Sequence, residues 1–149
     1  MKFKLFIIGI GAIFLGGFYA LSLGINQDEP SQNTVMSFGG RELSVKVADT
    51  PESRAHGLSG LDLLPAGEGL LFVFEAPESP GFWMKDMNFP IDILWFDSEK
   101  KLVDITEDFL PESFPETVYP IEPVMYVLET NINEFENIGD LIGEGFVFN

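Results

Sequence analysis

The 149-residue chain contains no cysteine and a single histidine, His56. The missing thiol excludes lipid attachment through a lipobox cysteine, disulfide cross-links and thiol catalysis. One histidine without cysteines provides neither a zinc-ligand set nor the base of a serine triad. The domain must therefore be stabilised by its hydrophobic core, and we interpret His56 as a surface residue of a short helix.

Basic residues are also scarce. Beyond residue 25, only six lysines and arginines stand against 24 aspartates and glutamates, a formal charge of −18. Such a surface repels phosphate backbones, which argues against nucleic-acid partners. We interpret the charge first as a source of solubility, with attraction of cationic ligands as the alternative. No calcium-loop spacing and no glycine-rich phosphate loop is present, so the sequence predicts no cofactor.

One long apolar run is present, from Leu5 to Ile25, and Lys2 and Lys4 precede it. At about 1.5 Å per residue, this run would just cross a hydrocarbon core of roughly 30 Å. A cleaved signal peptide is the competing interpretation, because small residues lie near the end of the run. The leading lysines orient the remainder outside the cytoplasm. We expect a single-pass membrane protein, or a secreted or periplasmic one if the segment is cleaved.

Three segments follow from this division: residues 1–25 as anchor or signal, residues 26–33 as a polar linker, and residues 34–149 as the folded domain. In the domain, short alternating strands flank turns, whereas residues 70–74 form an unbroken apolar run typical of a central strand. Caps predict short helices at residues 49–57 and 131–139. The pattern predicts an all-β domain, a single compact antiparallel sandwich or barrel of about seven to nine short strands.

The most aromatic stretch is GFWMKDMNFPIDILWFD, residues 81–97. It predicts a hairpin of residues 82–87 and 91–96, with Trp83 facing Trp95 on one side and Asp86 facing Asp92 on the other. Like charges directly opposite one another cost energy. This pair would require a bridging cation, a protonated carboxyl or a different register. It is the one weak metal candidate; no metal site is otherwise predicted.

Asp92 shares a strand face with apolar residues, so we hypothesise that it is partly buried and paired with Lys85 or Arg54. A buried charge requires a partner whether or not chemistry occurs. An ion pair that specifies the fold is therefore favoured over a catalytic role.

Several blocks together resemble the uncharacterised family DUF192: VADTPESRAHGL at residues 47–58, GLLFVF at 69–74, FWMK…PIDIL at 82–94, YVLE at 126–129 and GE at 143–144. The resemblance implies a compact, mostly β fold with no agreed activity, often behind a signal sequence. Its recurrent polar positions fall on Arg54, Lys85, Asp92 and Glu129.

The chain departs from the family pattern near the short helix. Ser59 and Gly60 stand where the family usually continues towards a second arginine, and Asp86 stands where it usually has asparagine. The loss of that arginine weakens any expectation that the helix region binds an anion.

For function, we expect a non-enzymatic extracytoplasmic module that binds a small ligand or an envelope protein. Trp83, Trp95 and the acidic residues 107–122 would lie near its site, together with the four recurrent polar residues. A hydrolase using Asp92 and Glu129 as acid and base is the alternative, and it needs one concave site holding both. A third possibility is a purely structural network of buried ion pairs.

Overall fold

The computed structural model describes residues 33–149, and within that range the chain forms nine strands and three short helices. The strands are β1 (Thr34–Phe38), β2 (Arg41–Ala48), β3 (Glu68–Glu78), β4 (Phe82–Trp83), β5 (Ile91–Phe96), β6 (Leu102–Phe109), β7 (Thr117–Val118), β8 (Val124–Asn131) and β9 (Val147–Phe148). The helices are α1 (Pro51–His56) and the 3-10 turns η1 (Pro111–Ser113) and η2 (Ile138–Leu141).

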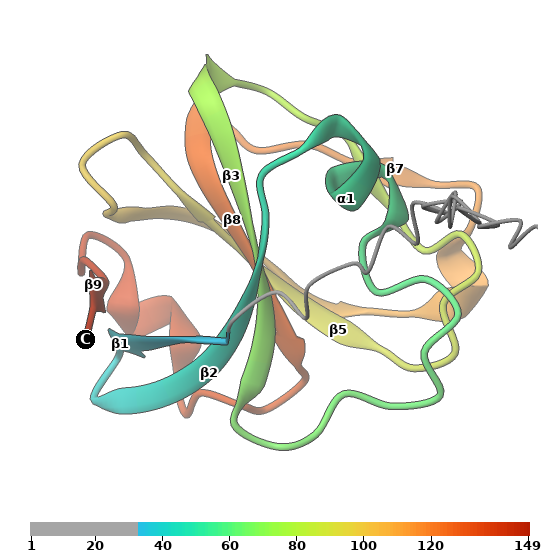
Figure 1. Cartoon of the computed structure of the whole chain (residues 1–149), viewed down its shortest axis with the longest axis horizontal. Helices are drawn as coiled ribbons and strands as arrows, with labels where there is room; N and C mark the ends of the chain where they lie inside the picture. Colours follow the sequence, from blue (N-terminus) through green and yellow to red (C-terminus); the bar gives the residue numbers. More distant parts are fainter. Residues whose placement is uncertain (1–32) are drawn as a thin grey trace, which may run out of the picture.

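Seven strands form one sheet in the order β6-β5-β8-β3-β2-β1-β9, and β4 pairs separately with β7. Figure 1 shows strands β3, β8 and β5 crossing the centre of the domain, with β1 and β9 at one side. The predicted mostly β fold is thus confirmed. Its wholly antiparallel character is wrong, because β2 and β3 run parallel. Parallel neighbours need a crossover connection, and residues 49–67, which include α1, provide it.

The sheet is apolar on both faces. In β3, Leu70, Phe72 and Phe74 belong to one buried cluster while Leu71 belongs to the other, which confirms residues 70–74 as a central strand. Strand β5 is buried along its whole length. Burial on both faces explains why these strands lack polar alternation.

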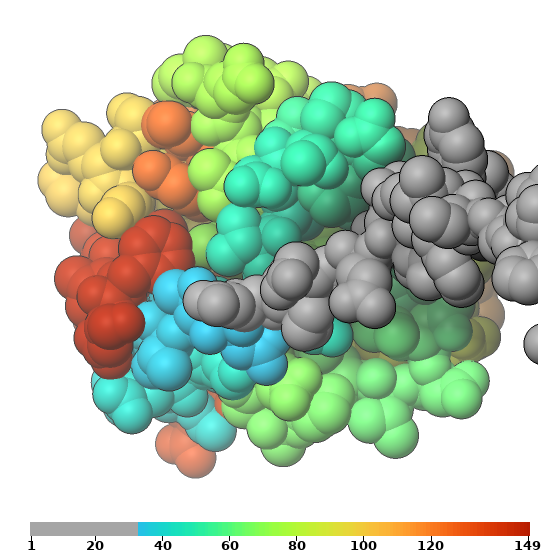
Figure 2. Space-filling view, viewed as in Figure 1, coloured from blue at the N-terminus to red at the C-terminus, as the bar shows by residue number. Residues whose placement is uncertain are grey.

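The sheet curls around the second cluster. The ring of Phe38 in β1 lies 5.1 Å from that of Phe96 in β5, although three strands separate them within the sheet. The C-terminal segment joins the two edges: β9 pairs with β1, and the amide of Leu102 donates to the carbonyl of Glu144. In Figure 2 the C-terminal residues, in red, lie beside those of β1, in blue. These edge contacts are not a continuous ladder, so the sheet is not a closed barrel.

Helix α1 forms where the cap pattern predicts it. The Thr50 hydroxyl accepts from the Ser53 amide, Pro51 occupies the first turn, and the helix ends at Gly57, whose φ is +56°. Glycine tolerates that backbone conformation without steric cost.

The helix predicted at residues 131–139 is wrong. Strand β8 continues through Asn131, which pairs with Ile91. Asn133 and Asn137 then adopt left-handed backbone angles, with φ of 60° and 48°. These angles are incompatible with a continuous α-helix, and only the turn η2 follows.

The hairpin predicted for residues 82–96 is also wrong. Strand β4 leaves the main sheet to pair with β7, while β5 pairs with β6 and β8. Trp83 therefore points outward, and Phe82 contacts Trp95 instead. The predicted pairing of Asp86 with Asp92 disappears with the hairpin.

Within residues 33–149, no helix has the length and apolar character needed to span a membrane. The span predicted at residues 5–25 lies outside the described residues.

Replacing Phe146 with alanine should destabilise the domain by about 3–5 kcal/mol, because this ring is 2% exposed and packs edge-on against Phe96 and Tyr126. Urea unfolding of the full chain in a non-ionic detergent measures the change. The neighbouring Val147→Ala, at a side chain that is 56% exposed, should change stability by less than about 0.5 kcal/mol. Equal effects of the two substitutions would contradict the proposed role of the C-terminal segment.

Candidate functional site

A cavity of about 230 Å³ lies between α1, the outer face of β3 and β4. It is walled mainly by apolar and aromatic residues and also contains three titratable side chains. The lining consists of Arg54, Ala55, His56, Gly57, Leu58, Ser59, Phe72, Phe74, Pro80, Gly81, Phe82, Trp83, Met87 and Glu129. A concave apolar site with a few convergent polar groups is the usual form of a small-molecule site.

Arg54 fixes α1 to the sheet. Its Nη1 donates to the Asp49 carbonyl at 2.6 Å and to the Val73 carbonyl at 2.9 Å. The guanidinium also lies over the Phe74 ring, 5.2 Å from its centre. The side chain thus joins the helix to β3 and forms one wall of the cavity.

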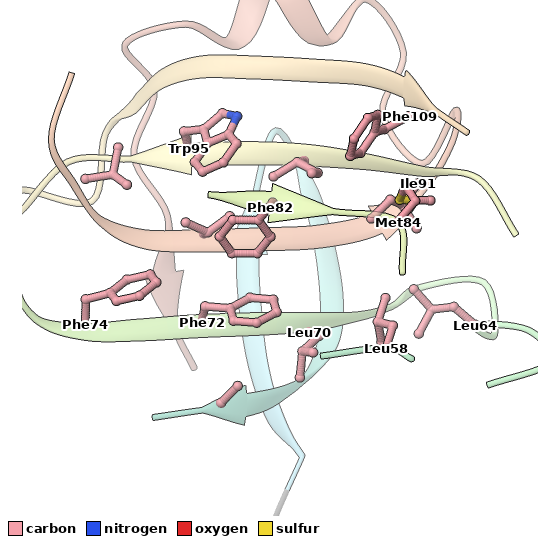
Figure 3. Packing of buried hydrophobic residues seen from close by; sticks show 14 residues of the cluster. Leu58, Leu64, Leu70, Phe72, Phe74, Phe82, Met84, Ile91, Trp95 and Phe109 are labelled. Carbon is pink, nitrogen blue, oxygen red and sulfur yellow. The ribbon is translucent and has the colours of Figure 1, made fainter. Parts of the chain in front are cut away.

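Aromatic rings form the opposite wall. Phe82 of β4 packs edge-on between Phe72, with ring centres 4.8 Å apart, and Trp95, at 5.2 Å (Figure 3). The next residue, Trp83, is 56% exposed and meets Phe114 at 6.4 Å. Strand β4 thus places one ring inside the cavity and one at its rim, as alternation along a strand requires.

Glu129 provides the carboxyl group of the cavity. It lies in β8, where its Cα partners are Leu70 of β3 and Ile93 of β5. The residue is only 6% exposed, and its Oε2 has no hydrogen-bond partner within the described protein. Burial raises the pKa of the Glu129 carboxyl from 4.5 to about 8.

A buried carboxyl with an unpaired oxygen is costly for the folded state, because the group loses water without gaining an equivalent partner. Native proteins keep few such groups, and those with perturbed pKa values are concentrated at functional sites. Glu129 is therefore the strongest candidate for a functional side chain in this domain.

Asp92 lies on the other face of the sheet. It is opposite Thr130 in the β5–β8 register, one position away from the Ile93–Glu129 pair, so the two carboxyl groups point in opposite directions. Its oxygens accept from the backbone amides of Asp108 at 2.9 Å and Asn133 at 3.3 Å. Burial raises the pKa of Asp92, and these two hydrogen bonds oppose the rise.

The predicted ion pair of Asp92 with Lys85 or Arg54 is wrong. Backbone amides take the place of the expected cation, and the Lys85 side chain is exposed. Within residues 33–149, the ion pairs are Arg41–Glu134 and Glu99–Lys101. The predicted network of buried ion pairs among the four recurrent polar residues is thus absent from this range.

Asp86 lies on the exposed connection after β4, where its carbonyl accepts from the Gly60 amide. Across the described residues, no group of three potential metal-ligating side chains comes together.

The structure brings together three of the five predicted site residues: Arg54, Trp83 and Glu129. Lys85 and Asp92 lie elsewhere. Sequence reasoning missed Phe72, Phe74 and Phe82 as site residues, because rings in strands are indistinguishable from ordinary core residues until the covering element is known. It also missed His56, whose place at the cavity depends on the position of α1.

Replacing Glu129 with glutamine should make stability less dependent on pH. Because the folded pKa of about 8 exceeds the usual 4.5, the folded state loses stability as pH rises between these values. The interval corresponds to at most about 5 kcal/mol. Urea unfolding between pH 5 and 9 should show a shallower decline for Glu129→Gln than for the unchanged chain.

The exposed Glu75→Gln is the matched control and should retain the original slope. An unaltered slope for Glu129→Gln would show that Glu129 is not held neutral by burial.

Replacing Asp92 with asparagine should cost about 1–3 kcal/mol, because the new amide group cannot accept from one of the two backbone amides. Thermal unfolding measures the loss. Asp108→Asn, at an exposed residue with φ of 51° that asparagine also tolerates, should leave stability nearly unchanged. No loss for Asp92→Asn would argue against these hydrogen bonds.

Comparisons with known proteins identify similar solved structures and the family of the chain. No curated protein matches the chain. The crystal structure of a candidate transcription regulator from Sinorhizobium meliloti 1021 is similar, with 27% identity and a TM-score of 0.70, covering 78% of this chain and 92% of that one. A protein of unknown function from Novosphingobium aromaticivorans DSM 12444 shares the fold, with 24% identity, a TM-score of 0.68 and coverage of 76% and 81%.

The family expected from the sequence blocks is confirmed. The model of DUF192, described as Uncharacterized ACR, matches residues 34–145, which includes every strand from β1 to β8. This match covers most of the chain, and the protein therefore belongs to the DUF192 family.

Proposed function

We propose that this protein is a small-ligand binding domain held outside the cytoplasm, and that the cavity beneath α1 is its binding site. The observation that carries the proposal is the unpaired, buried carboxyl of Glu129 inside a cavity with aromatic walls. A ligand that hydrogen-bonds to Glu129 would remove the cost of leaving Oε2 unpaired. The apolar walls would supply contact area for the rest of the ligand.

Binding is a better explanation of this cavity than hydrolysis. The hydrolase alternative requires Asp92 and Glu129 at one site, yet their side chains lie on opposite faces of the sheet. Besides Glu129, the titratable residues of the cavity are Arg54 and His56, and Arg54 is engaged with backbone carbonyls. The acid and base pair expected from Asp92 and Glu129 is therefore not assembled at one site.

The cellular location is part of the proposal. An apolar run at residues 5–25 behind two lysines supports either a transmembrane anchor with the domain outside or a cleaved signal peptide. DNA binding is not part of the proposal, although the similar Sinorhizobium meliloti protein is described as a candidate transcription regulator. The acidic charge of this chain would oppose contact with phosphates.

An envelope protein as partner is the second candidate. The observation that favours it is a group of exposed aromatic residues beside β4 and β7: Trp83 contacts Phe114, and Tyr119 lies against Gly81. Exposed aromatic groups of this kind are enriched at protein interfaces.

Filling the cavity should abolish ligand binding. Ala55 is exposed on α1 and lines the cavity, so Ala55→Trp should fill its mouth without disturbing the core. We expect a fragment library screened by ligand-observed NMR against the full chain in a non-ionic detergent to give binders that Ala55→Trp loses. Glu52→Trp adds the same ring on α1 outside the cavity and should retain them. Binders unaffected by Ala55→Trp would refute this site.

A further inference from the structure

We propose that the cavity beneath α1 binds an organic cation, an amine or quaternary ammonium group on a small apolar body, that pairs with the Glu129 carboxylate. This inference rests on the proposed ligand-binding function and adds the chemical class of the ligand.

The buried carboxyl defines what the ligand must provide. Glu129 lines the cavity although the residue is only 6% exposed, and its buried Oε2 lacks a hydrogen-bond partner within the described residues. An anionic ligand would be repelled strongly by the ionised carboxylate, because the site has a low dielectric. A cation would instead form a charge-assisted contact with that oxygen.

The walls suit a cation with an apolar body. Phe72, Phe74, Phe82 and Trp83 surround the cavity, and ring faces attract cations by their quadrupole. The domain already contains one such contact, since the Arg54 guanidinium lies 5.2 Å from the centre of the Phe74 ring. Quaternary ammonium groups are commonly held by aromatic residues combined in this way.

No charged side chain around Glu129 pairs with its carboxyl group within the described residues. From α1, the cavity contains Arg54 and His56; the neighbouring strands β3 and β5 present Leu70 and Ile93, and β4 presents aromatic residues. Arg54 Nη1 is directed to the carbonyls of Asp49 and Val73. Burial alone accounts for the raised pKa of Glu129, so no neighbouring cation neutralises it.

The acidic surface favours the same ligand class. With 24 acidic residues against eight basic ones in the whole chain, the field of the protein draws cations towards it and repels anions. The composition allowed attraction of cationic ligands as an alternative interpretation, and the cavity beneath α1 would be the place where they bind.

Proton release distinguishes this ligand class from others. Burial raises the pKa of Glu129 to about 8, so the carboxyl holds its proton at neutral pH unless a cation pairs with it. Pairing with a cation requires the carboxylate, so binding at neutral pH releases that proton to solvent. The affinity should rise about tenfold per pH unit below the Glu129 pKa and level off above it. A neutral ligand that accepts a hydrogen bond from the protonated carboxyl would show the opposite trend.

The test uses benzyltrimethylammonium, whose charge does not titrate, with benzyl alcohol and benzoate as neutral and anionic analogues. Calorimetry on the full chain in a non-ionic detergent, at pH 6 to 9 and in buffers of different ionisation enthalpy, measures affinity and proton release together. We expect the cation to bind more tightly than both analogues, with about one proton released near pH 6.5. Glu129→Gln should weaken binding at least tenfold and abolish proton release, whereas the exposed Glu75→Gln should change neither.

Three results would overturn the inference: no binding of the cation, equal binding by Glu129→Gln, or tighter binding of benzyl alcohol or benzoate. If an analogue binds and Ala55→Trp abolishes that binding, the cavity remains a ligand site and only the charge class is wrong. If neither these compounds nor the fragment library binds in a way that Ala55→Trp removes, the proposed function fails as well.

Discussion

The placement of β8 between β3 and β5 is the constraint on which the site depends. This strand is hydrogen-bonded on both sides, and its residues 127–130 are buried on both faces of the sheet. A carboxyl at residue 129 has no route to the surface along the strand. The raised pKa of Glu129 and its unpaired oxygen are both consequences of this central position.

Two kinds of buried acid occur in the same sheet and illustrate how environment decides their role. Asp92 lies near a strand end, where the backbone amides of Asp108, near the end of β6, and Asn133, just after β8, reach its oxygens. Glu129 lies deeper, between Leu70 and Ile93, where backbone amides are already used in the sheet ladder. The first carboxyl therefore supports the fold, whereas the second remains available to a molecule that enters the cavity.

Local patterns predicted much of the fold. Threonine, proline and glycine around residues 50–57 located α1, and the unbroken apolar run at residues 70–74 located the central strand. The failures concern long-range partners. Nothing local to Phe82 indicates that β4 pairs with β7, more than thirty residues further on, and nothing near Asp92 indicates that amides would satisfy it. The family pattern identified Arg54 and Glu129. The aromatic residues that line the same cavity could be identified only once the strand topology was known.

The crossover between β2 and β3 carries one wall of the cavity, while the sheet carries the other. Residues of α1 take no part in the strand ladder, and within the helix none is buried. Substitutions at Ala55 and His56, which are exposed and line the cavity, can change its entrance at little cost in stability, whereas Glu129 beneath them is held within the sheet. Changes at these two positions would alter what the cavity recognises, with Arg54, the sheet and its buried acid left intact.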